Sequence, residues 1–156
     1  MVWAAFITFL LLLFRARRYR NLKKISWLLG TWESVPGNGD TIIETWQRLK
    51  GPYEGTRHPE RNGSGIKSLL LNEKKKKVSL MLTLDKEEAT GVFLFEITEL
   101  SGTSFRCKCD ALDFPYKISY TKLNDDEIVI EMEGKSQQYE KISLTRKDKS
   151  YGRNSK

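Results

Sequence analysis

The sequence predicts an all-β fold: a closed antiparallel up-and-down β-barrel of about 8–10 strands, preceded by a hydrophobic N-terminal helix. Two observations carry this prediction. From residue 30 onward, short segments rich in aromatic and β-branched residues recur about every 8–12 residues, with turn residues between them. No long segment repeats with the helical period, which disfavours a parallel βαβ architecture. Closing such a meander into a barrel removes its two exposed edges.

The chain begins with a hydrophobic segment and its basic flank, residues 1–20. Residues 1–14 are apolar except for Thr8, and arginines follow at positions 15, 17, 18 and 20. This run is shorter than the roughly 20 residues that span a bilayer as a helix, and RARRYR is a poor context for signal cleavage. Three interpretations stay open: an uncleaved membrane anchor, an export signal, or a helix lying against a membrane. We expect a membrane-associated or exported protein, with a cytoplasmic one as the alternative.

Residues 22–146 are predicted to form the barrel, and residues 147–156 a polar tail. A short helical turn at residues 22–29 is expected first, because Leu22, Ile25, Leu28 and Leu29 share one side. Loop residues such as Pro36, Gly102 and Asn124 then separate the strands. The predicted strands cover residues 31–35, 41–49, 53–58, 66–71, 77–84, 91–100, 103–109, 116–123, 127–133 and 137–146.

The segment WLLGTW, from Trp27 to Trp32, contains a glycine two residues before a tryptophan. It resembles the G-x-W motif at the first strand of lipocalins, fatty-acid-binding proteins and the nitrobindin group. The resemblance implies a lipocalin-like barrel whose closed end is plugged by Trp32. It also implies that an arginine of the last strand, here Arg146, lies over that indole as a cation–π partner. Both roles are structural.

A closer resemblance covers residues 27–146. The chain is similar to a family of uncharacterised lipocalin-like proteins best represented in Bacteroidetes, which implies a barrel and an exported setting but no known activity. One difference is that this family usually reads His-Asp-Phe-Pro where Leu112 precedes Asp113 here. The matching pieces, in order, are WLLGTW, Glu44-x-Trp46, Phe93-x-Phe95, Asp113-Phe114-Pro115 followed by Ile118-x-Tyr120, and Ile130-x-x-x-Gly134.

A barrel of this size encloses either packed side chains or a small cavity. We expect a binding protein for a small apolar or amphipathic ligand, with Glu44 or Arg106 supplying polarity inside and Asp113 at the mouth. A buried Glu44 paired with Arg48 or Arg106 is an equally good interpretation of that carboxylate. The aromatic residues expected to line the cavity are Trp46, Phe93, Phe95 and Tyr120.

Two alternatives to ligand binding stay open. The first is a lipocalin-like isomerase or hydrolase that uses Glu44 and Asp113 as its carboxylates. The second is a packed structural barrel without a ligand, which acts through its surface. The sequence contains no phosphate-binding loop, nucleophile elbow or zinc-protease motif, so an enzyme is the less favoured class.

The charge distribution, the two cysteines and the single histidine disfavour nucleic-acid binding and metal or cofactor sites. The net charge is +7, but the basic residues gather at the N-terminal flank, in residues 74–77 and in the tail rather than on one surface with exposed aromatics. Nucleic acid is therefore not an expected partner. Cys107 and Cys109 are expected to be small buried residues, and His58 a solvated residue at a strand end. We expect no metal and no cofactor.

Overall fold

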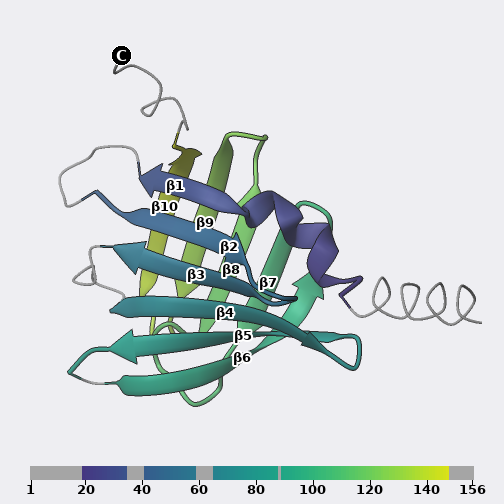
Figure 1. The fold of residues 1–156 in the computed structure, drawn as a ribbon. Coiled ribbons are helices and arrows are strands. Elements are labelled where there is room, and N and C mark those ends of the chain that lie inside the picture. The colour runs from purple at the N-terminus through teal and green to yellow at the C-terminus, as the bar shows by residue number, and fades with distance from the viewer. Residues whose placement is uncertain (1–18, 35–40, 59–64, 88, 148–156) are drawn as a thin grey trace, which may run out of the picture.

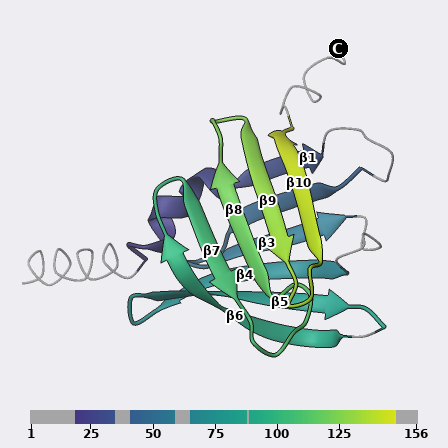
Figure 2. The same cartoon turned by 180° about the vertical axis from the view of Figure 1, so that it is seen from behind.

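The computed structural model describes residues 19–34, 41–58, 65–87 and 89–147. Ten strands form one closed barrel, in which each strand pairs antiparallel with its neighbours in sequence and the first pairs with the last (Figures 1 and 2). The strands are β1 (Gly30–Ser34), β2 (Ile43–Arg48), β3 (Tyr53–His58), β4 (Ile66–Lys74), β5 (Lys77–Asp85), β6 (Thr90–Leu100), β7 (Ser104–Lys108), β8 (Lys117–Lys122), β9 (Glu127–Glu133) and β10 (Tyr139–Arg146). The predicted closed up-and-down barrel is confirmed.

The inward face of the barrel follows the alternation in the sequence. On β5 the buried side chains are Val78, Leu80, Leu82 and Leu84, and the residues between them are half-buried or exposed. Successive strand residues point to opposite faces of a sheet, so these four fill the interior. The largest buried side chains of the other strands complete one core.

The turn between β4 and β5 is tighter than the sequence predicts. A loop over residues 72–76 was expected, but the strands continue to Lys74 and resume at Lys77. Lys75 and Lys76 make the turn with positive φ angles of 51° and 66°. The longer strand has a cause, because the Glu73 side chain points inward and binds the backbone of residues 21 and 22.

A 3₁₀-helix, η1 (Leu22–Leu28), lies across one end of the barrel (Figure 1). Its residues Leu22, Ile25 and Leu28 are fully buried, as expected for a helical turn with one apolar side. Glu73 Oε2 accepts hydrogen bonds from the backbone nitrogens of Asn21 and Leu22, at 3.0 and 2.9 Å. These bonds satisfy amide groups that the start of a helix leaves unpaired.

Trp32 and Arg146 close the barrel at the same end. The guanidinium carbon of Arg146 lies 4.1 Å from the centre of a Trp32 ring, which is the contact that the sequence predicts. The guanidinium also donates to the backbone oxygens of Leu29 and Trp27, at 3.0 and 3.1 Å, and Trp32 Nε1 donates to Leu28 O at 2.7 Å. Arg146 therefore ties the last strand to the segment between η1 and β1.

The predicted hydrophobic N-terminal segment covers residues 1–20, of which residues 1–18 lie outside the described residues, as does most of the polar tail. Among the helices that are described, none has the length and apolar character needed to cross a membrane.

Candidate functional site

A polar cluster lies inside the barrel, surrounded by the apolar core. Glu44 Oε2 accepts a hydrogen bond from Arg57 Nε at 2.7 Å and lies 2.6 Å from Arg57 Nη2. Glu44 Oε1 accepts from Trp46 Nε1 at 2.7 Å and from the Tyr120 hydroxyl at 3.0 Å. Arg57 Nη2 also donates to the Tyr120 oxygen at 3.3 Å. We call these four residues the interior cluster.

The surrounding strands hold the interior cluster in one geometry. Phe105 stacks on Tyr120 with ring centres 4.8 Å apart, and Trp46 meets Tyr120 edge-on at 6.2 Å. The Trp46 indole lies against Gly55, its register partner on β3. A Cβ atom on Gly55 would lie 2.9 Å from Trp46 Cε2, so only glycine leaves room for this indole.

The surroundings of the interior cluster favour the charged form of Arg57 and the protonated form of Tyr120. Burial opposes the charge of Arg57, but the charges and hydrogen bonds of Glu44 and Tyr120 together outweigh burial and raise the pKa of Arg57. Burial, and then the Glu44 charge, raise the pKa of Tyr120 well above its usual value. Arg57 is thus a cation and Tyr120 a hydrogen-bond donor at neutral pH. This arrangement stabilises a fixed geometry of the four side chains.

The aromatic residues that were expected to line a cavity pack against one another instead. Phe95 and Tyr120 are fully buried and Trp46 is 2% exposed, so water does not reach the space between them. Phe93 is half-buried and packs against the same core. The expectation of an open cavity at the centre of the barrel is therefore corrected, because the inward side chains fill it.

Two polar residues predicted for the site lie outside the barrel. Arg106 is exposed and pairs with Glu99 at 3.1 Å, because the alternation on β7 turns Phe105 and Cys107 inward. The Asp113 side chain is 86% exposed and lies 3.7 Å from Lys135. The enzymatic alternative requires Asp113 and Glu44 to face one cavity. The exposed Asp113 and the buried Glu44 do not share one.

The interior partner of Glu44 is Arg57, which the sequence reasoning missed in favour of Arg48 and Arg106. The alternation within β3 indicates the inward position of Arg57, although it does not indicate the partner. The alternation that turns Tyr53 and Gly55 inward also turns Arg57 inward, and all three are buried.

The remaining predicted residues have ordinary surroundings. Cys107 and Cys109 are buried free thiols, and His58 is exposed at the end of β3, as expected. Leu112, which replaces the histidine of the similar family, is buried in the apolar core. Within the described part of the chain, no group of three or more acidic, histidine or cysteine side chains is arranged to hold a metal ion.

The barrel wall opens beside η1. The hydrogen-bonded ladder between β5 and β6 begins at the pair Ser79–Glu96, so Lys77 and Val78 have no partner on β6. On its other side β6 changes register against β7 between Ile97 and Glu99. Such a bulge bends a strand and increases its twist, which carries the end of β6 away from β5.

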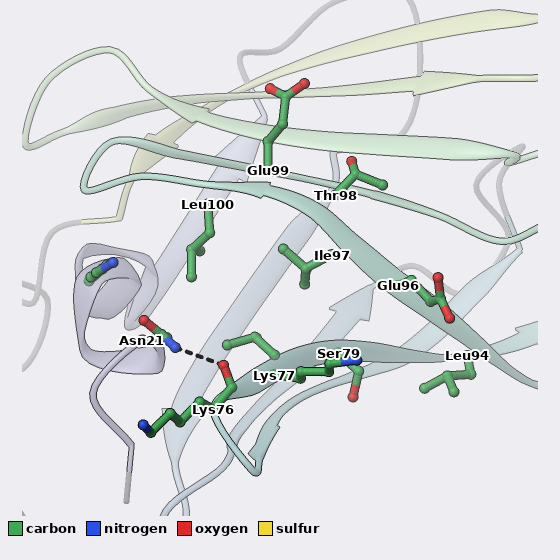
Figure 3. Close-up of a pocket in the computed structure, with 12 residues that line it drawn as sticks. Asn21, Lys76, Lys77, Ser79, Leu94, Glu96, Ile97, Thr98, Glu99 and Leu100 are labelled. Carbon is green, nitrogen blue, oxygen red and sulfur yellow. Dashed lines mark hydrogen bonds between the residues drawn. The ribbon is translucent and has the colours of Figure 1, made fainter. Parts of the chain in front are cut away.

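This opening holds a pocket of about 550 Å³, which we call the wall pocket (Figure 3). Its apolar lining consists of Val78, Leu94, Ile97 and Leu100, from β5 and β6. Ile97 and Leu100 are half-buried and pack against the core, whereas Leu94 is 56% exposed. The wall pocket therefore joins solvent to the edge of the core.

The rim of the wall pocket is charged. Lys24, Lys76 and Lys77 lie on the side of η1 and the β4–β5 turn, and Glu96 and Glu99 on the side of β6. The side chain of Asn21 donates to Lys76 O at 2.8 Å, which fixes η1 to that turn (Figure 3). Since Glu99 is paired with Arg106, the rim carries an excess of positive charge.

No family model, curated protein or solved structure matches this chain. The resemblance to the lipocalin-like family thus stays a prediction from sequence motifs, and the closed barrel is what the structure adds to it.

Proposed function

We propose that this protein binds a small amphipathic molecule, with one apolar chain and an anionic head, in the wall pocket. The observation that carries the proposal is the interrupted ladder between β5 and β6, which exposes core side chains within a charged rim. The volume of about 550 Å³ falls within the ~300–1,000 Å³ typical of small-molecule sites.

The residues that line the wall pocket suit both the apolar chain and the anionic head of such a ligand. Val78, Ile97 and Leu100 offer apolar surface next to the core, where a chain loses its contact with water. Lys24, Lys76 and Lys77 offer ammonium groups at the rim for a carboxylate or phosphate. The proposed ligand site thus lies at the wall of the barrel, whereas the sequence predicts a cavity inside the barrel that inward aromatic residues line.

The interior cluster supports this choice of site. Its charged groups are paired with one another and buried, so a ligand at the centre would have to displace core side chains and break the ion pair between Glu44 and Arg57. A ligand in the wall pocket displaces only solvent. The same burial argues against the enzymatic alternative, because a catalytic carboxylate must reach its substrate.

Isothermal titration of the full chain with dodecanoate, below its micelle concentration, tests the proposal. Thr98 is exposed and lines the wall pocket, so Thr98→Trp fills part of the space that the chain would occupy. Thr90, at the other end of β6, is also exposed and lies outside the pocket, which makes Thr90→Trp the matched control. We expect saturable binding by the wild type and by Thr90→Trp, and binding at least about tenfold weaker by Thr98→Trp, a loss of ~1.4 kcal/mol.

Two outcomes would overturn the proposal. Absence of saturable dodecanoate binding by the wild type would favour a packed barrel that acts through its surface. Equal affinities of the two tryptophan variants would place the binding site elsewhere.

A further inference from the structure

We infer that one face of the barrel docks on an anionic phospholipid bilayer. The face is made by the tip of the β4–β5 hairpin, the start of η1 and the outward side of β4, β5 and β6. This inference goes beyond the proposed ligand site, with which the face shares Lys24, Lys76, Lys77 and Leu94. Two features carry it: a group of exposed cations and a row of outward apolar residues beside them.

The cations come from two segments that are about fifty residues apart in the sequence. They meet because Glu73 and the backbone oxygen of Lys76 hold Asn21. Lys74 and Lys77 face each other in register at the hairpin. Arg20, Lys24 and Lys76 line one common hollow beside Glu73. We call the resulting group of exposed side chains the basic corner: Arg20, Lys24, Lys74, Lys75, Lys76 and Lys77.

Little negative charge opposes the basic corner. Its nearest carboxylate, Glu73, is 5% exposed, and one of its oxygens accepts two backbone hydrogen bonds. Of the two acids on the far rim of the wall pocket, Glu99 is paired with Arg106 and Glu96 is exposed. The corner therefore presents a positive surface to solvent.

An apolar row lies beside the basic corner on the outer wall. Leu70, Met81 and Leu94 are register partners across β4, β5 and β6, and each points away from the core. Leu94 is 56% exposed, and Val92, on the next outward row, is 66% exposed. Leu70 and Met81 each lie four residues along their strands from Lys74 and Lys77, which is roughly 13 Å.

This combination fits a membrane surface better than nucleic acid. Each lysine near an anionic bilayer contributes about 1 kcal/mol, and exposed aliphatic side chains add burial in the headgroup region. Nucleic-acid surfaces interleave basic residues with exposed aromatics, and no aromatic residue lies within the run Lys74 to Lys77. The sequence adds a second indication, since apolar residues 1–14 lie shortly before Arg20. An apolar segment together with a polybasic surface holds a membrane more firmly than either alone.

Vesicle flotation of the full chain tests the inference, with vesicles of phosphatidylcholine alone and of phosphatidylcholine with phosphatidylserine. Lys74→Glu/Lys75→Glu removes cations that do not line the wall pocket, so its effect is separate from ligand binding. Lys135→Glu/Lys141→Glu makes the same charge change at exposed positions near and on β10. We expect the first variant to bind phosphatidylserine vesicles at least about tenfold more weakly, and the control to lose much less.

A second pair of variants, one test and one matched control, examines the exposed apolar residues beside the basic corner. Val92→Ser is expected to weaken vesicle binding about two- to fivefold, and Leu123→Ser, at a comparably exposed leucine in the β8–β9 turn, to leave it unchanged. Equal losses in the two charge variants would overturn the inference. Equal binding of the wild type to both vesicle types, or tighter binding to a single-stranded oligonucleotide that Lys74→Glu/Lys75→Glu abolishes, would overturn it as well.

Discussion

Glu44 and Arg57 form an ion pair in the interior of the barrel, with 2.6 Å between Glu44 Oε2 and Arg57 Nη2 and no exposed surface on either side chain. Trp46 and Tyr120 satisfy the other carboxylate oxygen. A buried pair stabilises a protein only if its desolvation is offset by such partners. The interior cluster therefore joins β2 and β3 to β8 across the barrel, and the ligand site that we propose lies at the wall.

Removal of one partner of this pair should be far more costly than removal of an exposed cation. Arg57→Met leaves the Glu44 carboxylate buried without its counter-ion, and we expect a loss of about 3–5 kcal/mol in the free energy of unfolding. In Arg57→Met/Glu44→Gln the carboxylate is gone, so the double variant should be more stable than the sum of the single changes implies. Urea denaturation measures all three. Arg106→Met, at an exposed ion pair, is the control and should lose at most about 1 kcal/mol. Additive single changes would show that the two groups do not interact.

The link between Arg146 and Trp32 predicts that lysine cannot replace this arginine. Arg146→Lys keeps the charge but loses the planar group that covers the indole and donates to both Leu29 O and Trp27 O. We expect a loss of about 1–3 kcal/mol in the free energy of unfolding. Arg48→Lys, at an exposed position on β2, is the control and should be nearly neutral. Equal effects of the two changes in thermal denaturation would mean that Arg146 does not close the barrel.

The contact of Trp46 with Gly55 predicts a position-specific effect of one methyl group. Gly55→Ala places a Cβ atom 2.9 Å from Trp46 Cε2, so the indole must move and strain the interior cluster. We expect a loss of about 1–3 kcal/mol. Gly102→Ala, where nothing lies within 4 Å of the new atom, should be close to neutral. A neutral Gly55→Ala variant would contradict the tight packing of Trp46.

Stability should fall in alkaline solution. Burial raises the pKa of the Cys107 thiol, and burial followed by the Glu44 charge raises the pKa of Tyr120. The unfolded chain therefore ionises first, so each contribution is constant below the unfolded pKa and declines above it. The decline should begin near pH 8.5 for the thiol and near pH 10 for the phenol.

Urea denaturation at a series of pH values checks this dependence. Cys107→Ala should remove the part of the decline that begins near pH 8.5. Tyr120→Phe should reduce the part that begins near pH 10, to which Tyr53, whose pKa is also raised by burial, contributes as well. A stability that stays level or rises over this range would contradict the burial of both groups.

Much of the barrel could be predicted because the sequence patterns that specify its strands and turns are local. Alternation between apolar and polar residues locates each strand, and turn residues locate the connections, as in β5 and the turn at Asn124. The contact between Trp32 and Arg146 could be predicted because a sequence motif carries it. The end of β4 could not be predicted in this way, since its extension to Lys74 depends on hydrogen bonds that Glu73 accepts from residues far away in the sequence.

The site could be predicted only in part, for two physical reasons. Arg57 was missed because a charged residue on an inward face is favourable only with a buried partner, and nothing in β3 alone indicates Glu44. The wall pocket was missed because it depends on where the β5–β6 ladder begins and on a register shift near Ile97. Both are pairing properties of several strands, and no glycine or proline marks them in the sequence.

The most direct test of the account is an NMR titration of the isotope-labelled full chain with dodecanoate, which follows the backbone amide of every assigned residue. Binding in the wall pocket predicts saturable shifts that are largest at Val78, Ile97 and Leu100, with the amides of Glu44 and Tyr120 little changed. Shifts centred on Glu44 and Tyr120 would place the ligand inside the barrel and contradict the account, and the absence of any saturable shift would contradict ligand binding itself.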